Sequence, residues 1–254
     1  MALVETDLHG GVMTITLADE EHRNALGRRL TSELVAALDV ADHDPEVRVV
    51  VLTNTGTVFC AGANLAERSS ADPADAQSNI DPRALFGRFR HSPKPYVGRI
   101  AGHCVAGGMG LAAALDISVA VDHAKFGFTE VRVGVVPAMI SVVCLPKMRL
   151  ADAQAAFLRG HRFAAAEAAR MGLINSVVPK DSLDAEIDAI VGDLLAGGPD
   201  AIAAAKQLTA VVPTMREDEA FDWTAEMSAR LFAGDEAREG MTAFLEKRPA
   251  SWTQ

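Results

Sequence analysis

Patterns typical of β-strands and of α-helices alternate along residues 1–150 of the chain. Residues 12–17 alternate apolar and polar side chains and are rich in β-branched residues, which predicts a half-buried strand. Residues 30–41 place apolar side chains at helical spacing and predict an amphipathic helix. The same patterns recur, with strands expected at 47–53, 96–101 and 117–121 and a helix at 107–115. Such alternation is typical of α/β folds, in which helices cover the faces of sheets.

After Pro137 the pattern becomes mostly helical. Alanine-rich stretches at 151–157 and 164–170 are each followed closely by a glycine, which is a typical helix stop signal. Residues 177–179 are expected to form a short extended link. Further helices are expected near residues 181–196, 199–210, 216–232 and 235–246. The sequence therefore predicts an α/β region followed by a helical region.

The composition argues against several classes of function. A formal net charge of −10 disfavours a nucleic-acid-binding surface, which needs a basic stripe, although a few local cations can still hold an anionic ligand. The start of the chain has no signal-peptide pattern, and no apolar run is long enough to span a bilayer. We therefore expect no membrane association and a cytoplasmic location, which the three cysteines outside any Cys-x-x-Cys pair also favour. The seven histidines show no metal-ligand spacing, so no metal is expected.

Two glycine-rich segments, residues 59–65 and 106–110, carry the clearest chemical signal. Small residues let a backbone N–H group approach a ligand closely, because no side chain intervenes. Two such groups converging on one oxygen would stabilise negative charge there, as in an oxyanion hole. A carboxylate that follows, Glu130, is then a candidate acid–base group.

The same residues permit other interpretations. Residues 108–113 fit a relaxed dinucleotide-binding pattern, with Asp122 or Glu130 near the distance of the ribose-binding acid. A nucleotide-binding fold would usually place this turn early, however, whereas two strand–helix units precede it here. Hydrolysis through a nucleophilic serine is less favoured, since the chain has no Gly-x-Ser-x-Gly motif. Cys60 and Cys104 adjoin the glycine segments, and buried packing is the commoner role of such thiols.

With their surroundings, these segments resemble the crotonase (enoyl-CoA hydratase/isomerase) family over nearly the whole chain. The matching segments occur in the family's order and comprise residues 22–26, 59–65, 100–110, Asp116, 124–127, Glu130, Gly134, Pro137 and 239–248. The resemblance implies a crotonase-like spiral of ββα units over residues 1–195, which holds an acyl-CoA site. It also implies a C-terminal helical region over 196–254 that builds homotrimers, often paired into hexamers. An apolar stripe at Trp223, Met227 and Leu231 predicts core or subunit packing and suits such a region.

The resemblance also implies roles for individual residues. It places the oxyanion-hole N–H groups at Ala63 and Gly107 and the catalytic carboxylate at Glu130, for which the simpler interpretation is an ion pair with Arg132 or Lys125. The residues that it places against the acyl-CoA are Arg23, Ala25, Ala61, Asn64, Leu65, His103, Val105, Gly108, Pro137, Phe244 and Lys247. In the family, the aromatic residue and the lysine of the closing helix often reach CoA from a neighbouring subunit. Because CoA is part of the substrate, no separate cofactor is expected.

Other features of the sequence point to changes in the acyl pocket. Thr129 and residues 139–141 suggest that this pocket is reshaped. Asn64 replaces the aspartate often found in the first oxyanion segment. The stretch 69–81 is rich in Ser, Ala, Asp and Pro, and we expect it to be mobile and to shape the pocket.

The main departure from the family pattern is Gly110. Family hydratases carry two glutamates, and Gly110 stands where the one that can activate water is expected. Three alternatives follow. Glu130 serves both proton transfers, it shuttles one proton as in the Δ3,Δ2-enoyl-CoA isomerases, or another carboxylate such as Glu67 or Asp72 enters from the 66–81 segment. The expected function is water addition to trans-2-enoyl-CoA in fatty-acid metabolism, with the isomerase or a non-catalytic acyl-CoA-binding protein as alternatives.

Overall fold

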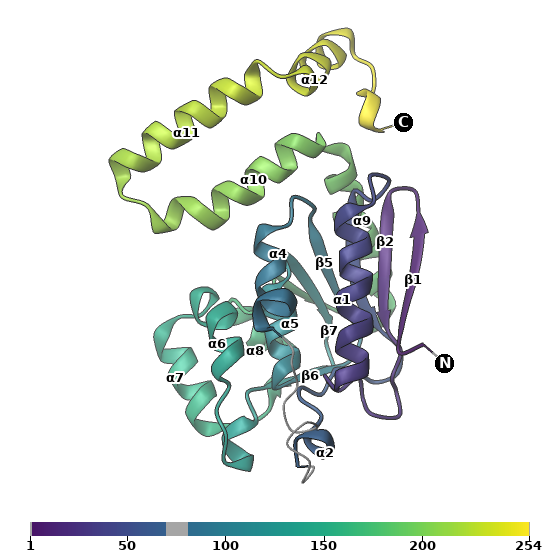
Figure 1. The fold of residues 1–254 in the computed structure, drawn as a ribbon, viewed down its shortest axis with the longest axis vertical. Helices are drawn as coiled ribbons and strands as arrows, with labels where there is room; N and C mark the ends of the chain where they lie inside the picture. The colour runs from purple at the N-terminus through teal and green to yellow at the C-terminus, as the bar shows by residue number, and fades with distance from the viewer. Residues whose placement is uncertain (1, 70–80, 254) are drawn as a thin grey trace.

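The computed structural model describes residues 2–69 and 81–253, so most of the 69–81 stretch and Asp72 lie outside the described residues. Within these residues, the larger sheet has six strands in the order β1-β2-β3-β5-β7-β10 (Figure 1). β1 and β2 are antiparallel, and the other neighbours are parallel. The strands are β1 (Val4–His9), β2 (Val12–Leu17), β3 (Val49–Asn54), β5 (Tyr96–Ile100), β7 (Ile117–Val121) and β10 (Ser176–Val178).

Burial explains why these strands form. Every residue of β3 is buried, as expected for a central parallel strand covered on both faces. β2 alternates buried and half-buried residues, which is the pattern that predicted it. Helix α1 (Arg28–His43) buries the apolar face predicted for 30–41 and packs on β1 and β2. The α/β prediction is confirmed. Residues 176–178 are more than a link, because they pair with β7 and extend the sheet.

A second sheet supplies the turns of the spiral. Its short strands pair in the order β4-β6-β8-β9, with the bounds β4 (Val58–Cys60), β6 (His103–Val105), β8 (Lys125–Gly127) and β9 (Phe163–Ala164). Each of β4, β6 and β8 follows closely on a strand of the larger sheet, and a helix comes next. The chain thus repeats a strand–strand–helix unit, which confirms the expected spiral. Sequence patterns missed these strands, since two or three residues are too few to show a period.

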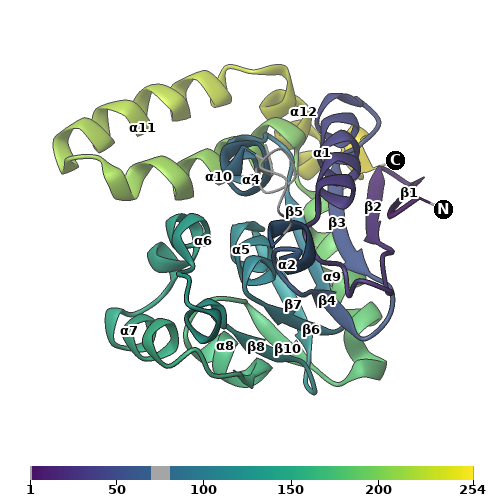
Figure 2. The same ribbon diagram turned by 60° about the horizontal axis from the view of Figure 1, so that its bottom comes forward.

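The described helices surround the two sheets (Figures 1 and 2). Besides α1, those up to residue 170 are α2 (Leu65–Arg68), η1 (Arg83–Gly87, a π-helix), α4 (Arg88–His91), α5 (Gly107–Ala114), η2 (Glu130–Val133), α6 (Ala138–Cys144), η3 (Leu145–Lys147), α7 (Leu150–Arg159) and α8 (Ala165–Arg170). Beyond residue 170 they are η4 (Lys180–Ser182), α9 (Leu183–Ala196), α10 (Pro199–Val211), η5 (Val212–Thr214), α11 (Glu217–Phe232), α12 (Asp235–Glu246) and η6 (Ser251–Thr253). In the part of the chain described, none of these helices has the length and apolarity needed to cross a bilayer.

Residues 199–253 form a C-terminal arm, in which α11 lies beside α10 and extends away from the sheets (Figure 1). Of the predicted stripe, Met227 is buried, while Trp223 and Leu231 are half-buried. An ion pair of 2.7 Å between Nζ of Lys206 and an oxygen of Asp116 connects α10 to the core. The arm begins just after the expected boundary between residues 1–195 and 196–254, and that division into two regions stays a prediction.

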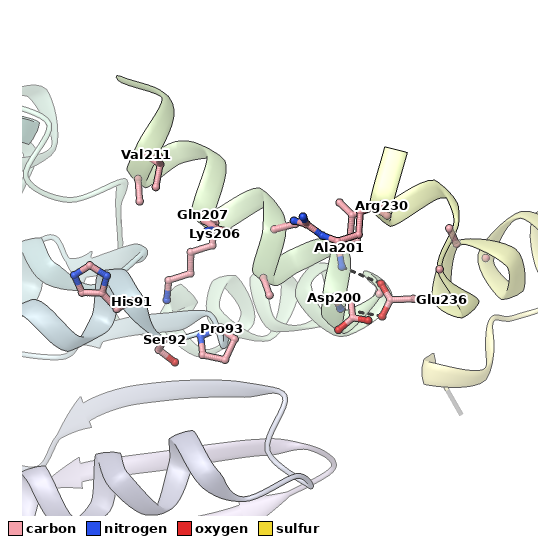
Figure 3. A pocket seen from close by; sticks show the side chains of 18 of the residues that line it. His91, Ser92, Pro93, Asp200, Ala201, Lys206, Gln207, Val211, Arg230 and Glu236 are labelled. Atoms are coloured by element: carbon pink, nitrogen blue, oxygen red, sulfur yellow. Dashed lines mark hydrogen bonds between the residues drawn. The ribbon is translucent and has the colours of Figure 1, made fainter. Parts of the chain in front are cut away.

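The arm also has a carboxylate clamp at the start of α10. The Glu236 side chain of α12 accepts hydrogen bonds of 2.9 Å from the backbone N–H groups of Asp200 and Ala201 (Figure 3). Helix N-termini carry unpaired N–H groups and a positive dipole end, so a carboxylate stabilises them. The clamp borders a cavity of about 930 Å³ that also contacts the end of α4.

We expect Glu236→Ala to lower the free energy of unfolding by about 1 kcal/mol, the usual effect of losing a helix cap. Glu236→Gln keeps an acceptor oxygen and should lose less. Urea denaturation of both variants measures the difference. Equal stability of the alanine variant and the parent would show that the clamp contributes nothing.

Candidate functional site

A cavity of about 460 Å³ lies beside α5 and brings several of the predicted site residues together. Its walls include Ala63, Gly107 and Glu130, together with the expected contact residues Ala61, Leu65 and Pro137. The larger cavity under the C-terminal arm has none of these groups, and two of its charged residues, Lys206 and Glu236, are already paired within the protein. The smaller cavity is therefore the candidate active site.

The first oxyanion segment depends on Gly62. Its φ of +85° lies in the left-handed region that disfavours side chains. A Cβ placed on Gly62 would lie 2.6 Å from the Cβ of Ala106 and 2.8 Å from the nitrogen of Gly107. The two glycine-rich segments therefore lie in direct contact, and only glycine fits where they meet.

The second segment begins α5. Its preceding residue, Ala106, has φ 49° and ψ −123°, a conformation that costs a non-glycine residue on the order of 1–3 kcal/mol. The N–H of Ala106 donates to the carbonyl of Gly127 at 2.9 Å, which ties the start of the helix to β8. Gly107 is the first helical residue, so its N–H has no acceptor within the helix and lies at the positive end of the dipole.

The two predicted donors lie close together. A Cβ placed on Gly107 would be 3.6 Å from the nitrogen of Ala63. Among the hydrogen bonds of the described residues, neither the Ala63 N–H nor the Gly107 N–H has an acceptor. A pair of neighbouring unpaired N–H groups at a helix start can accept one carbonyl oxygen and stabilise an oxyanion there.

Glu130 supplies the carboxylate in the same cavity. It begins the short helix η2, and its Oε2 atom is buried without a hydrogen-bond partner among the described residues. Burial raises the pKa of Glu130 above its ordinary value of 4.5. In the described part of the chain it forms no ion pair, and Arg132 donates its Nε–H to the carbonyl of Arg159 instead. A half-buried carboxylate of raised pKa, with one oxygen free of hydrogen-bond partners among the described residues, is suited to proton transfer.

Asn64, Gly108 and His103 have structural contacts away from the cavity lining. Asn64 caps α2, since its Oδ1 accepts from the N–H groups of Ala66 and Glu67. Gly108 is a packing glycine, because a Cβ there would lie 2.4 Å from the carbonyl oxygen of Cys60. The N–H of Lys125 donates to Nδ1 of His103 at 3.1 Å. Their expected contacts with acyl-CoA stay predictions.

The remaining predicted contact residues also lie outside the lining. Val105 is buried in β6. The backbone carbonyl of Arg23 accepts the N–H of Ala61 at 3.1 Å, and Ala25 lies two residues further along the chain, also outside the lining. Phe244 and Lys247 belong to α12 and its end, far from the cavity elements α2 and α5 within one chain (Figure 1). Contact of these two residues with CoA would require a neighbouring chain, and it stays a prediction.

Glu67 has a different role from the one considered for it. Its carboxylate accepts the N–H of Arg28 at 2.9 Å and the side-chain N–H of Asn64 at 3.1 Å. It thereby caps the start of α1 and lies outside the cavity lining. Glu130 is the one carboxylate that the described residues contribute to this cavity.

Much of the cavity wall is apolar, and part of it had no sequence signal. The wall residues not singled out from the sequence are Pro82, Leu85, Phe86, Val133, Val135, Val136 and Ala138. Val133, Val135 and Val136 are exposed, and exposed apolar residues in a loop often mark a binding groove, but only the structure shows this exposure. Leu85 and Phe86 lie on a π-helix, whose period no amphipathic pattern detects.

Two further expectations from the sequence concerned the cysteines and a metal site. Cys60 and Cys104 are fully buried, which confirms their interpretation as packing residues, and burial raises the pKa of Cys60 to about 12. Across the described ranges, no three His, Cys, Asp or Glu side chains are grouped as metal ligands.

Comparisons with known proteins find relatives that match nearly the whole chain. The family model described as Enoyl-CoA hydratase/isomerase matches residues 7–254. Enoyl-CoA hydratase EchA19 of Mycobacterium tuberculosis is 34% identical over 97% of this chain and 94% of its own length. Carnitinyl-CoA dehydratase of Salmonella arizonae is 31% identical over 96% of this chain and 95% of its own. The crystal structure of an enoyl-CoA hydratase from Mycobacterium smegmatis superposes with a TM-score of 0.92, at 29% identity and 99% coverage of both chains.

Proposed function

Because the chain belongs to the enoyl-CoA hydratase/isomerase family, we propose that it is an acyl-CoA enzyme that moves a double bond with one carboxylate. The observation that carries the proposal is the Glu130 carboxylate, whose Oε2 atom is buried without a partner among the described residues, in the same cavity as the N–H groups of Ala63 and Gly107. Position 110, where the family's hydratases carry their other glutamate, is a glycine.

The proposed reaction is the conversion of a 3-enoyl thioester into the conjugated 2-enoyl thioester. The thioester oxygen accepts hydrogen bonds from the Ala63 and Gly107 N–H groups. The Glu130 carboxylate takes a proton from Cα, and the electrons of that bond move through the thioester and the double bond to give a dienolate. Glu130 then returns the proton at Cγ, which leaves the double bond between Cα and Cβ. The two N–H groups hold the negative charge while it exists.

Water addition to trans-2-enoyl-CoA is the second candidate. The name of EchA19, which is 34% identical, favours it. It requires Glu130 to activate water and to deliver the proton to Cα without help from a side chain at position 110. The name of the Salmonella relative refers to another reaction, so membership of the family leaves the reaction open.

Two substrates separate these reactions. With a 3-enoyl-CoA, we expect the absorbance of the conjugated thioester to rise, while crotonyl-CoA is consumed much more slowly. If crotonyl-CoA is consumed faster and 3-hydroxybutyryl-CoA is detected by mass spectrometry, the reaction is hydration rather than isomerisation. Tight binding of both compounds without turnover would identify a non-catalytic acyl-CoA-binding protein.

The proposal predicts a displaced acid limb in the pH–rate profile. Only the ionised Glu130 can take a proton from Cα, so the rate rises as the pH rises through its pKa. Since burial raises the pKa of Glu130, the half-maximal point should lie above pH 4.5. Exchange of the α-protons of butyryl-CoA in D₂O, followed across the acidic range, measures it. A half-maximal point at or below pH 4.5 would contradict a general base whose pKa is raised by burial.

Assembly and location belong to the same proposal. We propose homotrimers or pairs of trimers, supported by the exposed apolar side chains Phe221, Phe232, Phe244 and Leu245 of the C-terminal arm. We also propose a cytoplasmic location and a role in fatty-acid metabolism. The mass in solution, measured by light scattering, tests the assembly.

A further inference from the structure

The space beside Gly110 is occupied by two apolar side chains. A Cβ placed on Gly110 would lie 2.3 Å from Cγ2 of Ile140, 2.9 Å from its Cβ and 2.9 Å from Cε1 of Phe86. Contacts of this kind are shorter than van der Waals packing allows, so neither a methyl group nor a longer side chain fits there. Position 110 therefore does more than lack a carboxylate, because hydrocarbon fills the place where its side chain would begin.

The two apolar residues come from different elements and meet at this point. Ile140 lies on α6 and is 3% exposed, and Phe86 lies on η1 and is 5% exposed. Both also line the candidate active site. α6 and η1 each pack on α5, and Ile140 and Phe86 both lie against the Gly110 position. We call the pair Phe86 and Ile140 the apolar wedge.

The wedge changes what this part of the cavity can hold. A water molecule needs two or more polar partners to be held in place, and neither wedge residue offers one in its side chain. Thr129, Glu130 and Arg132 are the polar side chains that the described residues add to the wall. A hydroxyl or carboxylate of an acyl group that reached the wedge would lose its hydrogen bonds to water without replacement.

We propose that Phe86 and Ile140 determine the specificity of this site. The wedge excludes attacking water from the side of the acyl group that faces residue 110. It selects acyl-CoA thioesters whose acyl group is a hydrocarbon chain without hydroxyl or carboxylate groups. This inference rests on the proposed function, since it takes the cavity as the acyl site. An acyl group with a terminal carboxylate should bind about 10–100-fold more weakly than its hydrocarbon counterpart, the factor expected for an unpaired polar group.

A stability cycle tests the packing independently of any catalysis. In the parent protein, we expect Gly110→Ala to lower the denaturation midpoint, because its methyl group overlaps Ile140. An Ile140→Ala background removes the 2.3 Å contact with Cγ2 but keeps the 2.9 Å contacts with Cβ of residue 140 and Cε1 of Phe86, so Gly110→Ala should lower the midpoint by clearly less than in the parent. Val142→Ala, on the exposed side of the same helix, serves as the control background and should preserve the loss. Equal losses of stability in all three backgrounds would contradict the packing of Ile140 against position 110.

A product assay tests the specificity. Two rates are measured in D₂O for each variant: formation of 3-hydroxybutyryl-CoA from crotonyl-CoA, and exchange of the α-protons of butyryl-CoA. The ratio of the first rate to the second should rise about tenfold or more in Ile140→Ala, because water then has access to the acyl group. Ile140→Val should give a smaller rise and Val142→Ala none. Ile140→Ala should also lose the preference for hexanoyl-CoA over adipoyl-CoA in binding assays, whereas Val142→Ala should keep it. An unchanged ratio and preference in Ile140→Ala would overturn the proposal.

Failure of the proposed function looks different. If the parent protein neither exchanges α-protons nor turns over any enoyl-CoA, the assignment of an enzyme is wrong. The stability cycle and the comparison of hexanoyl-CoA with adipoyl-CoA in binding still decide whether the wedge fills the site and selects hydrocarbon chains.

Discussion

Replacement of Glu130 by glutamine is expected to reduce turnover of enoyl-CoA by about 10²–10⁴-fold or more, the range attributed to general acid–base catalysis. The amide has nearly the same size and keeps the shape of the cavity, but it cannot take a proton from Cα. In the proposed mechanism, binding of the thioester depends on the N–H groups of Ala63 and Gly107 and on apolar contacts, so affinity for a saturated acyl-CoA should be almost unchanged. Steady-state kinetics and calorimetric titration with butyryl-CoA measure the two effects.

Glu67→Gln is the matched control for this experiment. Glu67 is also a glutamate near the first oxyanion segment, but its carboxylate caps α1 and does not line the cavity. We expect nearly normal turnover and a slightly lower stability, since the amide oxygen can still accept the N–H of Arg28. If Glu67→Gln abolished turnover and Glu130→Gln did not, the catalytic assignment would be reversed.

Gly62→Ala is expected to damage both the site and the fold. The added methyl group would lie 2.6 Å from the Cβ of Ala106 and 2.8 Å from the Gly107 nitrogen, so the second donor must move. Loss of one oxyanion-hole donor typically lowers kcat by about 10²–10³-fold. The left-handed φ and the overlap together should lower the free energy of unfolding by about 2–4 kcal/mol. Urea denaturation and kcat measurements give both values.

Gly10→Ala separates backbone strain from displacement of the donor. Gly10 also has a left-handed φ, of +55°, but a Cβ there meets nothing within 4 Å. It lies in the turn between β1 and β2, away from the cavity lining. We expect a loss of about 1–2 kcal/mol in stability and unchanged kcat. Similar kcat values for the Gly62 and Gly10 variants would show that the contact between the two segments has no role in catalysis.

The sequence predicts those elements whose side chains show a period over several turns or strand residues. β2, the buried face of α1 and the helices α9 to α12 are long enough for this, and the structure has them close to the expected bounds. β4, β6 and β8 have three residues each, and their positions are determined by pairing between strands rather than by local preference. Such pairing depends on contacts distant in sequence, which no window of residues reports.

The candidate site shows the same limit. Ala63, Gly107 and Glu130 were expected together, and the structure places them on one cavity. Phe86 lies in a segment without a recognisable pattern, and nothing in the sequence links it to Gly110 or Ile140. The absence of a glutamate at position 110 was visible in the sequence, whereas the hydrocarbon that fills its place is a property of packing between α5, α6 and η1.

The pairing of β4 with β6 has a consequence for how this enzyme can evolve. The two strands are parallel neighbours, with Cys60 opposite Cys104, and the two donors follow them by three and two residues. Adjacent strands lie about 4.8 Å apart in any sheet, so the pairing of β4 with β6 holds the two segments that carry the donors side by side. The rest of the chamber comes from segments such as 82–87 and 133–139, which are not part of that ladder. Mutation can remodel those segments for new acyl groups while the reactive centre keeps its dimensions.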